Sequence, residues 1–186
     1  NILEEVNPAR PESFLQLTLA VALLKSDKFD LVVQKTTELG VVRLVPVMTR
    51  LADIKLKDES DSNKRLVRWR RIALEAAKQS GRALVPEIGA PLSFSELIAA
   101  EASTDLRFLF SERDGLSLSS LPTEMPGESN EITALIGSEG GWTDVELKEA
   151  KAAGWIVITL GGRTLRAETA AIAVTTLLQH LFGDLK

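Results

Sequence analysis

The chain has 186 residues, of which 45% are hydrophobic, and a net charge of −4, so it is long enough to fold around a core and is globular rather than disordered. It has no cysteine and a single histidine, His180, which excludes disulfides, thiolate nucleophiles and metal sites built from several histidines. The acidic balance is not typical of a nucleic-acid-binding protein. No apolar run reaches the roughly 20 residues of a membrane span. We therefore expect a cytoplasmic protein with no membrane partner and no metal.

Apolar periodicity indicates alternating strands and helices after a polar lead-in at residues 1–13, and residues 14–186 are expected to form one domain. In chain order the pattern predicts strand 14–24, helix 28–39 capped by Ser26-Asp27, strand 41–47, helix 63–80, short helix 93–100, strand 106–110, strand 132–136, helix 143–153, strand 155–160 and a helix from Ala167 onward. This alternation favours an α/β fold with a mostly parallel sheet flanked by helices.

Two capping boxes fix helix starts, Ser93-x-x-Glu96 and Thr143-x-x-Glu146. The charged segment 50–62 is expected to be a loop with a short helix. Residues 115–130 are rich in serine, proline and glycine and are expected to form a loop.

Two strands near the C-terminus each end in a glycine-bearing loop that leads into a helix. Strand 132–136 is followed by the sequence GSEGG at 137–141, and strand 155–160 is followed by GGRTLR at 161–166. In an α/β sheet such loops lie side by side at the carboxyl ends of the strands, where ligands usually bind. Glycine also allows a close approach of the backbone to a ligand. We expect the chemistry of the protein here.

The first loop matches neither the dinucleotide fingerprint nor the Walker loop. One interpretation is a plain tight turn between strand and helix. The other is a site, because the Glu139 carboxylate can receive a cation, a hydroxyl or an amino group. In the second loop Arg163 and Arg166 are either surface charges or binding groups. Because helix N-termini prefer acids, the second interpretation assigns both arginines to a nucleic-acid phosphate or an anionic transition state.

Positive charge is concentrated in residues 63–82, where seven basic residues face a single acid, Glu75. The segment is either a solvated helix face or a track for a polyanion. Trp69 on the same helix is expected to pack in the core.

Four blocks of the sequence resemble the RsmE family of bacterial ribosomal RNA methyltransferases, in the order in which that family has them and over nearly the whole chain. The blocks are Lys28–Val41, Ala77–Pro86, Ile136–Gly141 and Leu160–Ala171. Ser138 stands where the family usually has proline, and Thr164 where it usually has a β-branched or larger apolar residue. Neither change removes a charged group, so we expect the pocket to be intact.

The resemblance implies a methyltransferase of the SPOUT class that uses S-adenosyl-L-methionine to methylate N3 of a uridine in small-subunit (16S) ribosomal RNA. It also implies a C-terminal trefoil knot, an exception to the rule that chains avoid threading, and a homodimer. Family members carry a PUA-like RNA-binding barrel before this region. We therefore expect the sequence to be the catalytic domain without that barrel.

The resemblance also assigns roles to residues. The candidate cofactor-binding residues lie in or beside three loops: Phe110, Ser111, Ile136, Gly137, Gly140, Gly141, Leu160, Gly161, Gly162, Thr164, Leu165 and Thr169. Arg166 is the candidate that holds the uridine or its developing negative charge, and Glu139 is the candidate base or positioning group. The concentration of charge in residues 63–82 and the two arginines of the second loop, rather than the resemblance, supply the candidate RNA-binding residues: Arg68, Arg71, Arg82, Arg163 and Arg166.

Two alternatives remain open at the level of sequence. The chain could be a knotted RNA-binding or assembly module without catalysis, in which the glycines serve only the turns. It could also be a related knotted methyltransferase that acts on tRNA. Stoichiometric binding of S-adenosylmethionine separates the first alternative from an enzyme, and an assay with defined RNAs separates the second.

Overall fold

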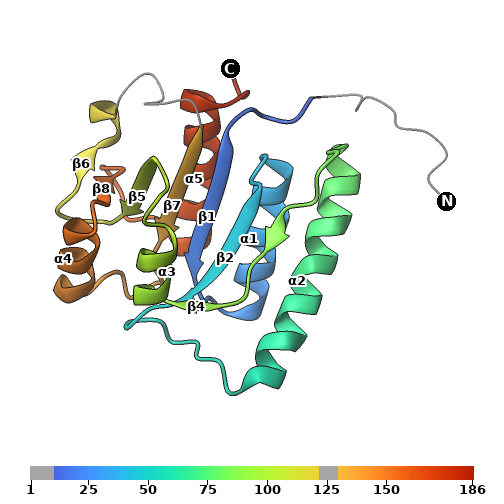
Figure 1. Ribbon diagram of the computed structural model, residues 1–186, viewed down its shortest axis with the longest axis horizontal. Helices are drawn as coiled ribbons and strands as arrows, with labels where there is room; N and C mark the ends of the chain where they lie inside the picture. The colour runs from blue at the N-terminus through green and yellow to red at the C-terminus, as the bar shows by residue number, and fades with distance from the viewer. Residues whose placement is uncertain (1–10, 122–129) are drawn as a thin grey trace.

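The computed structural model describes residues 11–121 and 130–186 of the chain (Figure 1). The helices are α1 (Ser26–Glu38), α2 (Glu59–Ser80), α3 (Phe94–Ala100), α4 (Asp144–Ala152) and α5 (Ala167–Phe182), with a 3-10 turn at Leu118–Ser120. The strands are β1 (Gln16–Ala22), β2 (Arg43–Met48), β3 (Glu87–Ile88), β4 (Leu92–Ser93), β5 (Leu106–Phe110), β6 (Leu116–Ser117), β7 (Glu131–Ile136) and β8 (Ile156–Thr159).

Within the described residues the strands form one sheet in the order β3-β2-β1-β7-β5-β8-β6, with β4 also paired to β2. Every pairing between these strands is parallel, which confirms the expected α/β class. The central strand β1 lies between β2 and β7, so that Leu19 is beside Leu44 on one side and Ala134 on the other. All three side chains are buried, as expected for a parallel sheet covered on both faces.

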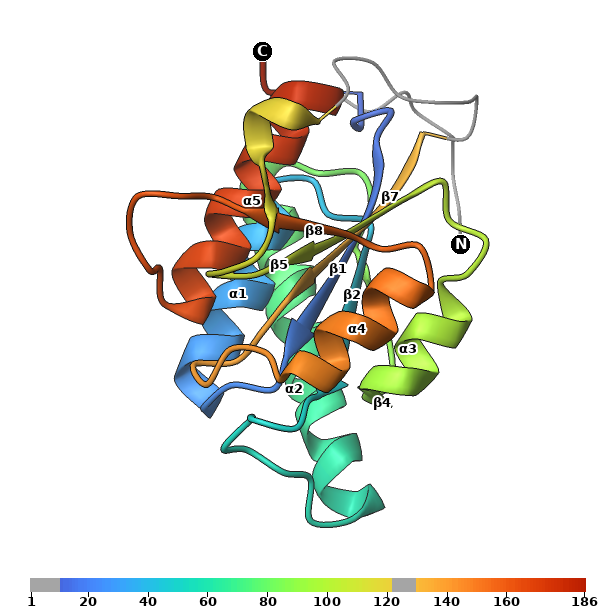
Figure 2. The ribbon, with the colours of Figure 1, turned by 90° about the vertical axis from the view of Figure 1, so that its left-hand side faces the viewer.

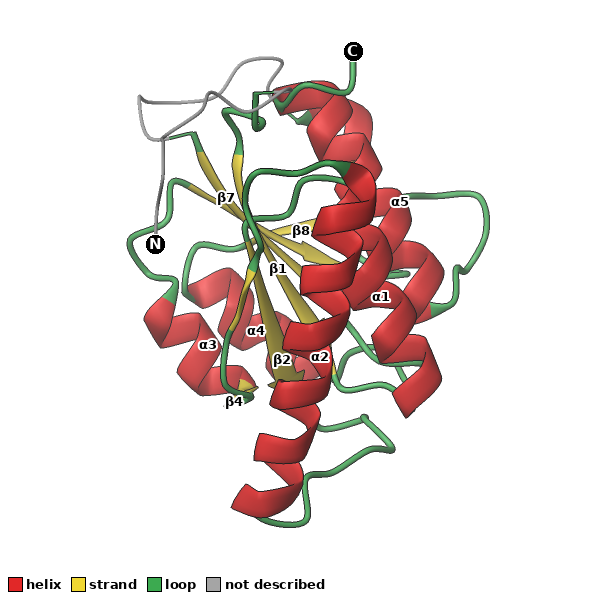
Figure 3. Ribbon diagram, turned by 90° about the vertical axis from the view of Figure 1, so that its right-hand side faces the viewer, coloured by secondary structure: helices red, strands yellow, loops and turns green. Residues whose placement is uncertain are grey.

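Helices cover the two faces of the sheet unequally. Figure 2 shows α3 and α4 on one face and α1 and α5 on the other, and Figure 3 shows α2 beside α1 on that second face. The larger core joins Leu19 to Phe29 and Trp69 of the second face, with the two aromatic ring centroids 4.3 Å apart. The smaller core joins the next residue, Ala20, to Trp142 and its neighbours. Successive residues of β1 thus point to opposite cores, as pleating requires.

Both predicted capping boxes are confirmed. The Ser93 hydroxyl accepts from the Glu96 backbone N–H while the Glu96 carboxylate accepts from the Ser93 N–H. Thr143 and Glu146 make the same reciprocal pair at α4. In addition, the buried Glu146 accepts a hydrogen bond from the Arg50 backbone N–H at 2.9 Å. This bond ties the segment after β2 to the start of α4.

Some predicted boundaries are wrong. Helix α1 begins at Ser26, and its N-cap is Lys25, which makes no side-chain capping bond in the described structure. Helix α2 begins at Glu59, earlier than expected, because Asp58 caps it by accepting from the Asp61 N–H. The expected loop 115–130 contains the short strand β6 and a 3-10 turn in its described part, and residues 122–129 lie outside the described residues.

The expected lead-in 1–13 lies mainly outside the described residues, but its last two residues contact the domain. The Ser13 hydroxyl donates to Gln179 Oε1 at 2.8 Å. The Glu12 carboxylate accepts from Arg82 Nη2 at 2.8 Å and from the backbone N–H groups of Ala83 and Leu84. Among the helices of the described residues, none combines the length and apolar character that crossing a bilayer requires.

Arg82, a candidate for RNA binding, makes structural contacts in the described fold. Its side chain is only 7% exposed, and besides Glu12 it donates to the carbonyl oxygens of Thr37 and Val41 at 2.9 and 2.8 Å. The guanidinium therefore joins the lead-in to the turn after α1. The pattern of the sequence could not show this, since the three partners come from distant segments.

Replacing Arg82 by alanine should destabilise the fold by about 2 kcal/mol, because a largely buried carboxylate and two carbonyls lose their donor. Burial alone would raise the pKa of Glu12, but the hydrogen bonds from Arg82 and the backbone outweigh it and lower that pKa below its ordinary 4.5. The stabilisation of the fold by the interaction between Arg82 and the Glu12 carboxylate is therefore present above pH 4.5 and is lost as the pH falls through the lowered pKa of Glu12.

Thermal unfolding of the wild type, Arg82→Ala and the exposed control Arg71→Ala measures this contribution. At pH 7 only Arg82→Ala should unfold at a lower temperature, and the gap should shrink in acid. Equal unfolding temperatures for all three chains at pH 7 would refute the structural role of Arg82.

Candidate functional site

A cavity of about 350 Å³ opens at the carboxyl edge of the sheet, where β5, β7 and β8 end. This volume is within the range of small-molecule sites. The lining comes from the segments after these three strands and from the first turn of α5: Phe110, Ser111, Glu112, Ile136, Gly137, Ser138, Glu139, Gly140, Gly141, Trp142, Thr159, Leu160, Gly161, Gly162, Arg163, Thr164, Leu165, Ala167 and Ala170. All the candidate cofactor residues except Thr169 are in this lining. Thr169 is exposed on α5.

The loop after β7 is compact because its glycines touch other parts of the fold. A Cβ on Gly137 would lie 3.0–3.2 Å from the Trp142 ring, and a Cβ on Gly140 would lie 2.8 Å from the Leu51 carbonyl oxygen. The Trp142 indole N–H donates to the Phe110 carbonyl at 2.8 Å. This bond fixes the end of β5 against the loop, so the two walls of the cavity form one unit.

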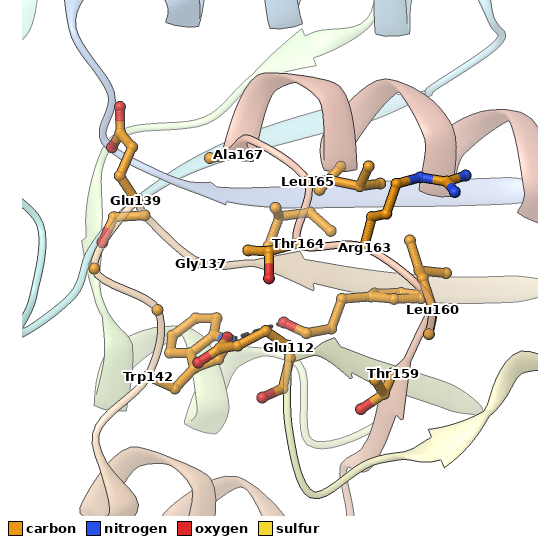
Figure 4. Close-up of a pocket in the computed structure, with 18 of the residues that line it drawn as sticks. Glu112, Gly137, Glu139, Trp142, Thr159, Leu160, Arg163, Thr164, Leu165 and Ala167 are labelled. Carbon is orange, nitrogen blue, oxygen red and sulfur yellow. Dashed lines mark hydrogen bonds between the residues drawn. The ribbon is translucent and has the colours of Figure 1, made fainter.

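The loop after β8 presents bare backbone to the cavity. Gly161 and Gly162 have φ values of +75° and +72°, which favour glycine. Apart from each glycine and its two chain neighbours, no heavy atom of the described residues lies within 4 Å of where their Cβ atoms would be. Leu160, Leu165 and Ala167 supply apolar side chains on this side (Figure 4). The loop can therefore bring both backbone polar groups and apolar surface against a ligand.

Two polar side chains of the lining make no hydrogen bond with the described residues, although Glu112 Oε1 lies 3.8 Å from Arg113 Nε. The Ser138 hydroxyl is buried and has no hydrogen-bond partner among residues 11–121 and 130–186. The Glu112 carboxylate lies beside Gly141, where a Cβ would approach its oxygen to 2.8 Å. By contrast, the Thr159 hydroxyl already accepts from the Gly115 N–H at 3.1 Å. A buried polar atom without a partner is costly unless a ligand or water satisfies it, so the cavity suits a ligand with polar groups.

Glu139 also lines the cavity, but its side chain points away from the centre toward the segment between β1 and α1 (Figure 4). Its carboxylate accepts from Lys28 Nζ at 2.5 Å, and this hydrogen bond lowers the pKa of Glu139. A carboxylate with a lowered pKa is a weak proton acceptor. The geometry therefore favours positioning over general base catalysis for Glu139.

The two arginines of the second loop are exposed. Arg163 lines the cavity and extends along its rim (Figure 4). Arg166 is the N-cap of α5 and lies outside the lining. Neither side chain makes an ion pair or hydrogen bond with the part of the chain that the structure describes. Both guanidinium groups are thus free to meet an anion, and that of Arg163 lies in the lining of the cavity.

Several residues of the site were missed by sequence reasoning: Glu112, Ser138, Trp142, Thr159, Ala167 and Ala170 in the lining, and Lys28 behind it. A signal existed for most of them, since Glu112 and Thr159 lie at or just after strand ends and Ser138 and Trp142 belong to or follow the glycine loop. No such signal existed for Lys28. The described residues contain no group of three or more His, Asp or Glu that could hold a metal ion.

This site lies in a chain that matches the family described as RNA methyltransferase domain, over residues 11–179. The fold and the site thus define an RNA methyltransferase domain. A ribosomal RNA small subunit methyltransferase E from Mesomycoplasma hyopneumoniae is 35% identical over 161 residues, which cover 87% of this chain and 68% of that protein. The one from Synechocystis is 37% identical, over 84% of this chain and half of the relative. The chain belongs to the RsmE family.

Solved structures support the assignment to this family. The small subunit methyltransferase E from Neisseria gonorrhoeae bound to S-adenosyl methionine superposes with a TM-score of 0.87 at 32% identity, over 97% of this chain and 72% of that one. A putative methyltransferase from Legionella pneumophila with the cofactor bound gives 0.86 at 32%, over 94% and 69%. The fold is that of the SPOUT methyltransferases.

Proposed function

We propose that this chain transfers a methyl group from S-adenosylmethionine to N3 of a uridine in small-subunit ribosomal RNA, in the cytoplasm. The observation that carries the proposal is the cavity between the two glycine loops. It is built by the same fold that holds S-adenosylmethionine in the relatives from Neisseria gonorrhoeae and Legionella pneumophila.

The residues present fit that cofactor. Leu160, Leu165 and Ala167 offer apolar surface for a flat adenine ring, and the open backbone at Gly161 and Gly162 can pair with its edge. The Glu112 carboxylate in the lining suits the hydroxyl or amino groups of the rest of the molecule. The cavity volume is adequate for one such ligand.

The bound cofactor would supply an electrophilic methyl carbon, and its transfer forms the N3–carbon bond as the sulfur–carbon bond breaks with the electron pair remaining on sulfur. Uridine N3 is only weakly acidic, so its proton must be lost to water, and the negative charge that this leaves spreads over the ring. Arg166 would donate hydrogen bonds to that charge, which is supported by its exposure at the start of α5, next to lining residues Leu165 and Ala167, and by its lack of partners in the described structure. Glu139, fixed by Lys28, holds the first loop in position.

The same proposal includes a C-terminal trefoil knot and a homodimer. Support comes from the likeness of the fold to the SPOUT methyltransferases, while α4 and α5 lie on opposite faces of the sheet on either side of β8 (Figure 2). Light scattering of the purified chain at twice the mass of a protomer would support the dimer, and a monomer mass would refute it.

RNA is proposed to lie across the carboxyl edge of the sheet rather than along α2. Exposed cations follow three strands at this edge: Lys25 after β1, Arg50 after the neighbouring β2, and Arg163 and Arg166 after β8. Within residues 11–121 and 130–186 they have no ion-pair partner.

On α2, by contrast, acids neutralise several of the cations. Arg65 pairs with Asp61, Lys78 with Glu75, and Arg68 with Asp30. Arg71 stays exposed there and remains a sequence-based candidate. Unpaired cations bind phosphates without first losing a partner, which favours the edge.

Lys25→Ala/Arg50→Ala should therefore bind a small-subunit ribosomal RNA fragment more weakly than Lys64→Ala/Arg71→Ala, although each double variant removes two exposed cations. Removing two phosphate contacts should reduce the slope of log affinity against log salt by about 1.4 to 1.8. Filter binding over a salt series measures both. A larger loss for the α2 pair would place the RNA along α2 instead.

Calorimetric titration with S-adenosylmethionine, followed by methylation of small-subunit ribosomal RNA and mass spectrometry of its nucleosides, tests the function. Binding of one cofactor per chain and the appearance of 3-methyluridine are expected. A folded chain that binds no cofactor would point to the non-catalytic module. Methylation confined to tRNA would identify tRNA as the substrate instead of ribosomal RNA.

A further inference from the structure

A cluster behind the cavity joins three elements that are distant in sequence. Lys28, in the first turn of α1, has its Nζ 2.5 Å from Glu139 Oε1 in the loop after β7 and 3.8 Å from Glu168 Oε2 in the first turn of α5. Both carboxylates belong to segments adjoining the glycine loops of the cavity. We refer to Lys28, Glu139 and Glu168 as the clasp.

The three side chains differ in exposure, and Glu168 is the most buried of them. The side chains of Lys28, Glu139 and Glu168 are 24%, 36% and 12% exposed. One oxygen of Glu168 is buried with no hydrogen-bond partner in the described residues, so the nearby ammonium is the cation that offsets its charge. Removing an ammonium from between two carboxylates leaves like charges facing each other in a partly dry site, which is costly.

The neighbouring charges do not replace Lys28. Arg166 lies close enough to lower the pKa of Lys28, whereas Glu139, through its hydrogen bond, raises that pKa and keeps the ammonium charged. Lys25 contributes to the lowered pKa of Glu139 but makes no ion pair with it in the described structure. Glu168 has a further favourable contact, with the N-terminus of α5, where an acidic side chain stabilises the helix.

We propose that Lys28 is a positioning residue for methyl transfer, because through Glu139 and Glu168 it holds both cofactor loops in their binding geometry. The inference rests on the proposed function. Lys28 lies outside the cavity lining, so its effect passes through the loops rather than through contact with the cofactor. If the cofactor binds only when the loops are assembled, its apparent dissociation constant is the intrinsic one divided by the fraction of chains with assembled loops.

Lys35 on the same helix provides a matched control. It pairs with Glu38 at 2.9 Å, one turn away within α1, and this pair joins no second element. Lys28→Met and Lys35→Met therefore each remove one paired ammonium from α1, but only the first opens the clasp. Lys28→Arg keeps the charge and should restore much of the function.

Amide hydrogen exchange without ligand tests the clasp independently of any activity. Lys28→Met should speed exchange in both 137–142 and 163–168, while Lys35→Met leaves both unchanged and Lys28→Arg stays close to the wild type. Unchanged exchange in the two loops of Lys28→Met would overturn the clasp even if the chain binds no cofactor. If the wild type binds none, the proposed function fails separately.

Titration and kinetics then test the consequence for methyl transfer. Lys28→Met should raise the dissociation constant of S-adenosylmethionine by about tenfold, the effect of a loop free energy of about 1.4 kcal/mol. At saturating cofactor kcat should recover most of its value, whereas a residue that touches the reacting atoms would keep a low kcat. A wild-type dissociation constant in Lys28→Met, or a loss equal to that of Lys35→Met, would refute the proposal.

Discussion

Replacing Arg166 by alanine should lower kcat for RNA methylation by about 100-fold, the usual cost of removing a donor that stabilises developing negative charge. Cofactor affinity should stay close to the wild type, because Arg166 lies outside the cavity lining. The fold should be intact as well, since the exposed side chain makes no capping bond at α5 and no ion pair within the described residues.

The measurement is steady-state methylation of small-subunit ribosomal RNA at saturating S-adenosylmethionine, with thermal unfolding as the check on the fold. Arg166→Lys should fall between the wild type and alanine, because it keeps the charge but loses the two-pronged donor geometry. Lys148→Ala, an exposed change on α4, is the neutral control. Undiminished kcat in Arg166→Ala would remove this residue from the mechanism.

Replacing Gly140 by alanine should both destabilise the protein and weaken cofactor binding. The new Cβ would meet the Leu51 carbonyl oxygen at 2.8 Å and the Leu51 Cβ at 2.9 Å. The carbonyl oxygen and the Cβ of Leu51 are fixed by its backbone and cannot turn away as the end of a flexible side chain would. The loop or the segment after β2 must therefore move. Overpacking of this kind costs about 1–3 kcal/mol, and the displaced loop should bind S-adenosylmethionine about tenfold more weakly.

Gly89→Ala is the matched control, because its Cβ would find ordinary contacts at 3.6 and 3.7 Å and its backbone has no positive φ. It should leave the unfolding temperature and the dissociation constant almost unchanged. If Gly140→Ala behaved like Gly89→Ala in calorimetric titration and thermal unfolding, the close packing of the first loop would not matter for binding.

Local patterns in the sequence were sufficient for most of the fold and for the walls of the cavity. The strand at Leu106–Phe110 and both capping boxes depend on neighbouring residues, and the structure confirms them. Glycine loops at two strand ends were enough to locate the site, because parallel strands bring their carboxyl ends to one edge.

What the sequence could not supply are contacts between distant segments. Lys28 and Glu139 are 111 residues apart, and Glu12 and Arg82 are 70 apart. Charge alone made Arg82 a candidate for RNA, whereas its three-dimensional partners make it part of the core architecture. The same limit explains why the basic composition of α2 suggested a polyanion track before its ion pairs were visible.

The position of β1 in the middle of the sheet also shapes how the chain must fold. Gln16 pairs with Glu131, so β1 cannot complete its pairing until β7, which is synthesised much later, is available. Pairings between remote segments slow folding, since the connecting chain loses its freedom before the contact forms. On the ribosome, the emerging N-terminal half therefore exposes an unpaired apolar strand edge until β7 appears, which is the interval in which such chains are most prone to aggregate.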